Sequence, residues 1–185
     1  MSQATVQWYS FAVDQAHVAA YSTSVAATWT ELPVISGSTI DIAVTRADVR
    51  DGEGALKHTW FHTQTATVTL TMRRWAMRVL ELISGNPVSS YSGYQDIQVG
   101  TDAEITPPRC RLKLRCKAVD ENGENEGFMY VYVYACQFGF PSIGMAETTP
   151  GEITMEGSCL QVGYDEDAVA MVKDAFLRIE AIQSA

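Results

Sequence analysis

The sequence predicts a mainly β protein with two packed antiparallel sheets, a β-sandwich or barrel, flanked by one α-helix. Val, Ile, Thr and Tyr recur in short alternating runs interrupted by Gly, Pro and Asn, which is the pattern of strands and turns. One segment, at about 73–84, changes clearly to helical spacing. The length of 185 residues suits a single domain, 1–185, and no apolar run approaches the ~18 residues that span a bilayer.

The alternating runs place the strands, and the helix follows one of them. Residues 64–72 belong to a Thr-rich strand, with Thr at every second position from 63 to 71. The helix is expected at about 73–84, because its apolar residues fall on one face and Gly85 and Pro87 end it. We expect strands near 6–13, 17–22, 38–46, 64–72, 109–119, 127–138, 152–163 and 175–182.

Two segments are less regular. Residues 46–63 carry the turn signals Asp51-Gly52 and Glu53-Gly54 but no periodicity, so we expect an extended loop there. The C-terminal segment 164–185 fits helical spacing and strand alternation equally, and the sequence leaves that choice open.

A long hairpin is predicted at 109–138. Asn122-Gly123 is the favoured central pair of a type I′ turn, and a turn there sets the register of both strands. Apolar residues then face apolar residues, and cations face rings. The expected pairs are Cys116–Met129, Leu114–Val131, Leu112–Val133, Cys110–Ala135, Arg115–Tyr130, Lys113–Tyr132 and Arg111–Tyr134.

The second face of this hairpin is charged and aromatic, and it needs a partner. A nucleic acid or an acidic protein surface would suit it. The net charge of −9 argues against nucleic acid: without the five cations of the hairpin, eight Lys and Arg stand against 22 Asp and Glu, or −14. We therefore expect a subunit contact made by Arg109, Arg111, Lys113, Arg115, Lys117, Tyr130, Tyr132 and Tyr134.

No motif indicates catalysis, a metal or a cofactor. His58 and His62 are four residues apart, but their segment reads as extended and lacks a zincin Glu. The tip 119–127 has only part of a calcium-loop pattern, and Glu152 and Glu156 read as solvated strand acids. The four cysteines read as reduced core residues. We expect no enzyme, no metal site and no cofactor.

The order of elements resembles the major tail tube proteins of long-tailed bacteriophages. The likeness rests on "TWTELP", a loop carrying "RDGEG", the strand "TATVTLT" running into one helix that ends at Gly85, the long hairpin, and "FPSIGMAETTPGEITMEGS" with its closing strand. The fold that it implies is shared with the tubes of contractile injection machines.

The resemblance implies a structural virion protein that forms stacked hexameric rings, a tail tube through which DNA passes without specific binding. Its partners would be copies of itself and other tail proteins, with no membrane and with assembly in the host bacterial cytoplasm. No signal peptide is recognisable at the N-terminus. The loop would reach the next ring through Asp48, Arg50, Asp51, Glu53, Lys57 and Trp60. Candidate counter-charges for the basic row are Asp102, Glu104, Asp165, Glu166 and Asp167.

Two alternatives stay open on the sequence. The first is a nucleic-acid-binding β domain that uses the Arg/Lys and Tyr face of hairpin 109–138. The second is a related virion part, a tail terminator or a head decoration protein.

Overall fold

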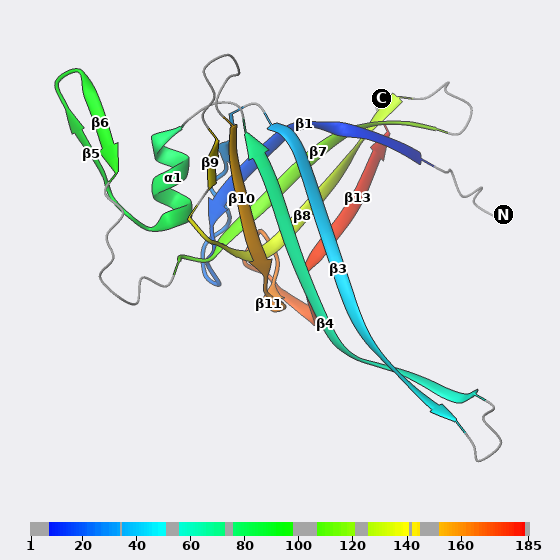
Figure 1. Ribbon diagram of the computed structural model, residues 1–185. Coiled ribbons are helices and arrows are strands. Elements are labelled where there is room, and N and C mark those ends of the chain that lie inside the picture. Colours follow the sequence, from blue (N-terminus) through cyan, green and yellow to red (C-terminus); the bar gives the residue numbers. More distant parts are fainter. Residues whose placement is uncertain are drawn as a thin grey trace.

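A computed structural model of the chain describes residues 8–33, 35–50, 56–72, 76–97, 107–120, 126–140, 142–144 and 152–183. Strands dominate this part of the chain, which has one helix, and every pairing between strands is antiparallel (Figure 1). The fold class expected from the sequence is therefore confirmed. The strands are β1 Trp8–Ala20, β2 Thr30–Glu31, β3 Ile35–Arg50, β4 Leu56–Met72, β5 Val88–Tyr91, β6 Tyr94–Ile97, β7 Cys110–Asp120, β8 Glu126–Phe138, β9 Ser142–Gly144, β10 Glu152–Cys159, β11 Val162–Tyr164, β12 Ala170–Ala175 and β13 Leu177–Gln183.

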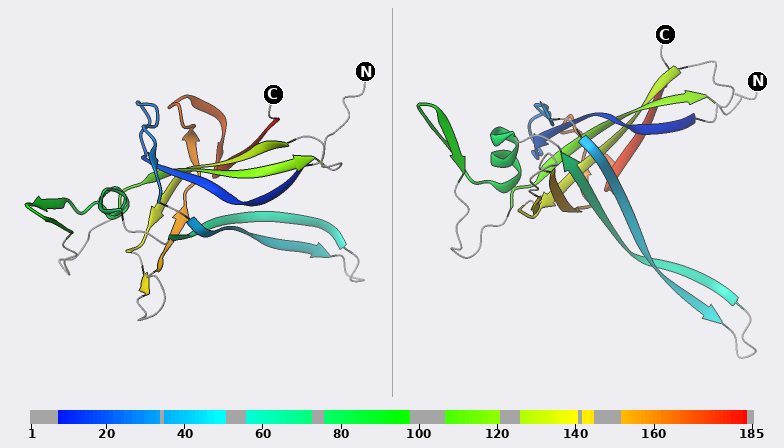
Figure 2. Two further views of the ribbon diagram at one scale, coloured as in Figure 1. Left: turned by 90° about the horizontal axis from the view of Figure 1, so that it is seen from above. Right: turned by 45° about the horizontal axis from the view of Figure 1, so that its top comes forward.

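The main sheet follows the order β2-β1-β7-β8-β10-β4-β3, with β13 beside β8 and β9 beside β10. Strand β8 belongs to both halves of this sheet. From Gly127 to Val133 it pairs with β13, and from Cys136 to Phe138 it pairs with β10. The strands β1, β7, β8 and β13 form the β7–β8 half, and β10, β4 and β3 form the β3–β4 half, which crosses it (Figure 2). We call the short β8–β10 pairing the seam.

The core lies between the two halves and under the helix. Leu112 of β7 and Val133 of β8 belong to the same buried cluster as Val68 of β4 and Met155 of β10. These side chains occupy alternate positions of their strands, which is why one face of each half is apolar. Burial of this face is the main favourable term in folding.

The helix α1, Met77–Ser84, closes one end of the core. Val79 and Ile83 are buried, and Gly85 ends the helix with φ 75°, donating its N–H to the carbonyl of Glu81. The left-handed backbone conformation at the end of a helix favours glycine, which has no Cβ. The helix was expected from residue 73; residues 73–75 lie outside the described part.

The C-terminal segment, whose sequence fits a helix and a strand equally, forms strands. It forms β11 and β12, a separate two-stranded sheet, and then β13 on β8. Near the other terminus, the two strands expected at 6–13 and 17–22 are one strand, β1. Register shifts between Ser10 and Val13 and between Val13 and Gln15 interrupt its alternation, which is why the sequence reads as two strands.

The extended loop expected at 46–63 is mostly strand. Strand β3 continues to Arg50 and β4 begins at Leu56, so only 51–55, outside the described residues, separates them. Register shifts follow Thr45 and Val49, and these bulges remove the periodicity that would have revealed the strands. The hairpin projects well beyond the body (Figure 1).

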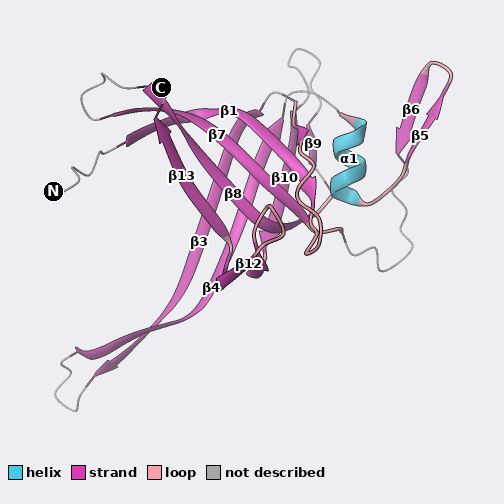
Figure 3. Cartoon of the chain, turned by 180° about the vertical axis from the view of Figure 1, so that it is seen from behind, coloured by secondary structure: helices cyan, strands magenta, loops and turns pink. Residues whose placement is uncertain are grey.

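A second, smaller hairpin lies on the far side of the helix. Strands β5 and β6 pair only with each other in the described part of the chain, and they stand beyond α1, away from the main sheet (Figure 3). Tyr91 and Tyr94 stack at its tip with ring centroids 4.8 Å apart.

Candidate subunit interface

The β7–β8 hairpin has the register that its sequence predicts over most of its length. The pairs Lys113–Tyr132, Leu114–Val131, Arg115–Tyr130 and Cys116–Met129 are confirmed, as is Leu112–Val133. The register shifts between Cys110 and Leu112, so Cys110 lies opposite Cys136 instead of Ala135. This shift also removes the expected Arg111–Tyr134 pairing. The turn itself, 121–125, lies outside the described residues.

Cations and rings alternate across the face that points away from the core. The Lys113 Nζ lies 4.9 Å from the Tyr130 ring centroid and 5.4 Å from that of Tyr132, and the Arg115 Cζ lies 4.6 Å from that of Phe128. Strand β13, which pairs with β8, extends the row. Its Arg178 lies opposite Tyr132, with the Cζ 4.6 Å from the centroid of that ring. Each of these cation–ring contacts contributes ~0.5–1 kcal/mol of stability where it is exposed, so the row as a whole stabilises this face of the hairpin.

One ion pair joins this row to β1. The Arg115 Nη2 and Nε donate to the two carboxylate oxygens of Asp14, at 2.7 and 3.1 Å. This bidentate hydrogen bond from Arg115 holds the pKa of Asp14 below its usual value, and Asp14 in turn raises the pKa of Arg115. Arg115 therefore already has an anionic partner within its own chain.

Arg111 is fully buried, at 0% exposure, and serves the interior of the chain. Its guanidinium donates to the backbone carbonyls of Ser22 and Glu166, the latter at 2.9 Å, and lies over the Tyr21 ring. The Glu166 carbonyl also accepts from the N–H of Ala27, at 2.9 Å. Arg111 thus holds the 21–29 segment and the β11–β12 turn on β7, and it lies outside the accessible interface.

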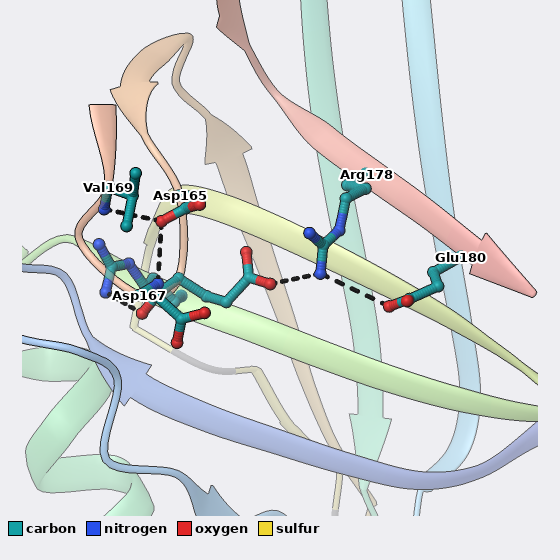
Figure 4. A network of polar contacts seen from close by, with 7 residues as sticks. Asp165, Asp167, Val169, Arg178 and Glu180 are labelled. Atoms are coloured by element: carbon teal, nitrogen blue, oxygen red, sulfur yellow. Dashed lines mark hydrogen bonds and ion pairs between the residues drawn. The ribbon is translucent and has the colours of Figure 1, made fainter. Parts of the chain in front are cut away.

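The Glu166 side chain is held in the same region by another arginine. Arg178 donates to the Glu166 carboxylate and, at 3.5 Å, to that of Glu180 on its own strand (Figure 4). Asp165 Oδ1 accepts from the backbone N–H of Asp167 and of Val169, which closes the turn between β11 and β12 (Figure 4). Of the expected counter-charges, Asp165 and Glu166 therefore have partners in their own chain. Asp102 and Glu104 lie outside the described residues.

The tyrosine row divides along the hairpin. Tyr132 and Tyr134 are buried in a second apolar cluster with Val162 of β11, and Tyr130 is half-buried at its border. Arg109, directly before β7, and Lys117, toward the other end of that strand, are exposed. The accessible part of the predicted contact is therefore Lys113, Arg115, Lys117 and Tyr130, together with Arg109 at the far end.

The predicted inter-ring residues lie on the projecting hairpin. Asp48 and Arg50 belong to β3, and Lys57 and Trp60 belong to β4. Asp51 and Glu53 lie outside the described residues. These residues are separated along the sheet from the cation–ring row, which belongs to the β7–β8 half.

The sequence did not identify the open edge of β13. This strand pairs with β8 on one side, and no strand in the described ranges pairs with its other side. The N–H of Tyr134 donates to the carbonyl of Phe176, so these two residues form a hydrogen-bonded pair of the β8–β13 ladder. Because such pairs alternate with non-hydrogen-bonded ones, the backbone N–H and C=O groups of Leu177, Ile179 and Ala181 point away from β8. Ile179 is 61% exposed at this edge and Ile182 is 45% exposed.

One hollow of the described surface could take a small molecule. An open hollow of about 400 Å³ lies beside the seam, lined by Gln137, Phe140, Glu156 and their neighbours. Within the described residues, no three His, Cys, Asp or Glu side chains are grouped as metal ligands. No described helix is both long and apolar enough to cross a membrane.

Comparisons with known proteins show no match to a family model and no match among curated proteins. Among solved structures, the chain is similar to one from the extended sheath–tube complex of an extracellular contractile injection system, PVC. The identity is 11%, the match covers 91% of this chain and 89% of that chain, and the TM-score is 0.46. A likeness this distant carries no function, so the interface rests on the residues of this chain.

Proposed function

We propose that this protein is a structural virion subunit that self-assembles into stacked hexameric rings, forming a phage tail tube through which DNA passes. The observation that carries the proposal is the pair of open edges at β13 and β3. The assembled form would be part of a virion tail, built in the host cytoplasm and joined to other tail proteins. The subunit would act through its shape and contacts, without catalysis or a cofactor.

Open edges on one sheet are suited to contacts between unlike surfaces of identical subunits. An unpaired strand presents N–H and C=O groups that another strand can satisfy, and a long one is a hazard unless something covers it. Strand β3 spans Ile35–Arg50 and, among the described strands, pairs only with β4. If β13 of one copy met β3 of the next, the same contact repeated would close a ring.

Exposed apolar side chains lie at these edges. Ile179 on β13 and Ile42 on β3 are 61% and 51% exposed, although each belongs to a strand that contributes to the core elsewhere. Burial of such side chains between copies adds about 25 cal/mol for each Å² of apolar area. The edges would thus supply both hydrogen bonds and apolar contact.

The charge of the chain suits a conduit. A chain with a net charge of −9 repels a polyanion over most of its surface, so DNA could slide past it without being held. In this proposal Lys113 and Lys117, with Tyr130, meet acidic groups of a neighbouring subunit rather than phosphates, while Arg115 stays paired with Asp14. The projecting β3–β4 hairpin would reach the adjacent ring.

Electron microscopy of the purified protein in negative stain tests the proposal. Rings, or hollow tubes of uniform width, are the expected result. A stable monomer at all concentrations would contradict it, and a monomer whose affinity for DNA falls steeply with salt would favour the nucleic-acid-binding alternative. The burial of Tyr132 and Tyr134 already removes two of the rings that such binding would use for stacking on bases.

A further inference from the structure

Three of the cysteines lie side by side on adjacent strands. Cys136 of β8 lies directly opposite Cys110 of β7 and, on its other side, directly opposite Cys159 of β10. All three are free thiols in the same buried cluster, with exposures of 0%, 0% and 6%. The fourth, Cys116, lies opposite Met129 and Val13 and has no cysteine across from it.

The two neighbours of Cys136 are not equivalent. The N–H of Gly139 donates to the carbonyl of Glu156, and the N–H of Leu160 donates to that of Ala135. Both are therefore hydrogen-bonded pairs of the seam. Hydrogen-bonded and non-hydrogen-bonded pairs alternate along an antiparallel ladder, so the Cys136–Cys159 pair, which follows Leu160–Ala135, is of the non-hydrogen-bonded type. The backbone of Cys136 then points to β7, which makes its pairing with Cys110 the wider, hydrogen-bonded type.

The non-hydrogen-bonded pairs bring side chains closest together. Their Cα atoms are about 4.5 Å apart, within the 4.4–6.8 Å that a disulfide spans. The next pair of this type along the seam is Gly157 with Phe138, and a Cβ on Gly157 would lie only 2.8 Å from the Phe138 ring. The Phe138 ring thus covers Gly157, whereas the closeness of Cys136 and Cys159 follows from the type of their pair. The Cys136 thiol donates to the Cys110 carbonyl at 3.3 Å, a contact that it gives up when the bond forms.

We infer that Cys136 and Cys159 are a disulfide site, reduced where glutathione keeps thiols reduced and joined in an oxidising medium. The bond would join β8 and β10 at the seam, a short pairing that in the described residues runs from Leu160–Ala135 to Glu156–Gly139. It would therefore fix the junction of the two halves of the sheet. This inference concerns the single chain and does not depend on its assembly.

The oxidant is a low-molecular-weight disulfide such as oxidised glutathione. One thiolate attacks it, releasing one glutathione thiolate and leaving a mixed disulfide on the cysteine. The second cysteine thiolate then attacks the protein sulfur of that mixed disulfide and releases the other glutathione. Two protein thiols lose two electrons and two protons, and one oxidised glutathione gains them as two reduced molecules.

Burial determines when this reaction proceeds. It raises the pKa of Cys159 to about 11 and that of Cys110 to about 12, and raises the pKa of Cys136 well above its ordinary value. The folded thiols are thus mostly protonated at neutral pH and slow to react. The bond is expected to form during folding or during opening of the seam.

Refolding in a redox buffer tests the inference without this barrier. The reduced, denatured chain is refolded in mixed reduced and oxidised glutathione, free thiols are then alkylated, and the peptides are mapped by mass spectrometry. We expect one linkage, Cys136–Cys159, with Cys110 and Cys116 alkylated. The linked protein should unfold at a temperature about 5–10 °C higher than the reduced one.

Two single variants serve as matched controls. Cys116→Ala should retain the linkage, and Cys159→Ala should prevent it. Alkylation of all four cysteines in folded wild-type protein, a Cys110–Cys136 linkage or a mixture of linkages would each overturn the inference. Mapping of the wild-type chain decides this even if a variant fails to fold.

Discussion

The two long hairpins of this chain have the same secondary structure and opposite surroundings. Strands β7 and β8 lie in the middle of the main sheet, between β1 on one side and β10 and β13 on the other. Strands β3 and β4 end the sheet, and the end of β3 and the start of β4 extend beyond the body (Figures 1 and 2). The β7–β8 hairpin therefore mainly stabilises the monomer and offers only its outer cations to a neighbour, whereas we expect the β3–β4 hairpin to serve contacts with other copies.

The largest expected difference between the hairpins is in their apolar side chains. Leu112 of β7 is fully buried, whereas Ile42 of β3 is 51% exposed. Leu112→Ala should lower the free energy of unfolding by about 2–5 kcal/mol, because it leaves a cavity in the core. Ile42→Ala should lower it by less than about 1 kcal/mol. Urea denaturation of the unassembled chain measures both, and equal losses would refute the comparison.

A second test concerns the buried cation of the β7–β8 hairpin. Arg111→Met removes both hydrogen bonds to the Ser22 and Glu166 carbonyls, and we expect it to lower the free energy of unfolding by about 2 kcal/mol. Lys117→Met, at an exposed position of the same strand, should change it by less than about 0.5 kcal/mol. If Arg111→Met abolishes assembly with no loss of stability, Arg111 belongs to the interface after all.

A smaller effect is expected from the Asp14–Arg115 pair. The pKa of Asp14 is lowered in the folded chain, so its contribution is fully present above the unfolded value of about 3.9 and is lost as the pH falls through the folded value. Asp14→Asn should cost less than about 1 kcal/mol at pH 7, and the difference from wild type should vanish once the pH has fallen below the lowered pKa of Asp14. Urea denaturation across this pH range measures the difference, and a constant one would contradict the assignment.

The smallest effect on the monomer is expected from shortening the projecting hairpin. Removal of residues 50–58 should leave the unfolding transition almost unchanged, because the neighbouring ends of β3 and β4 project away from the body (Figure 1). In the proposed assembly it should allow rings but prevent their stacking, which microscopy of the variant would show. Tubes of ordinary length would exclude the tip from inter-ring contact.

The sequence was most informative where the pattern is local. The Asn122-Gly123 pair and the alternation on both sides of it predicted the β7–β8 register, apart from the shift beyond Leu112. For β3 and β4, bulges after Thr45 and Val49 hid the strands from the same reasoning. Alternation detects a regular ladder and loses it where the ladder is interrupted.

The site was harder to predict because its burial depends on distant segments. The segments that cover Arg111 include Ser22 and Glu166, which are 89 and 55 residues away in sequence. The local sequence, in which Arg111 is one of five alternating cations, therefore does not show that Arg111 is buried. The open edge of β13 was missed because the spacing of the C-terminal segment fits a helix equally well. Only the partners of a strand show whether its edge is free.

The central claim, that copies join through the open edge of β13, is tested most directly by sedimentation of an edge variant. Ala181→Pro removes an outward N–H and leaves the ladder to β8 intact, whereas Ala181→Ser keeps the N–H as a control. We predict that the wild-type protein and Ala181→Ser sediment as large assemblies, and that Ala181→Pro sediments as a folded monomer. Assemblies of unchanged size in Ala181→Pro would contradict the claim.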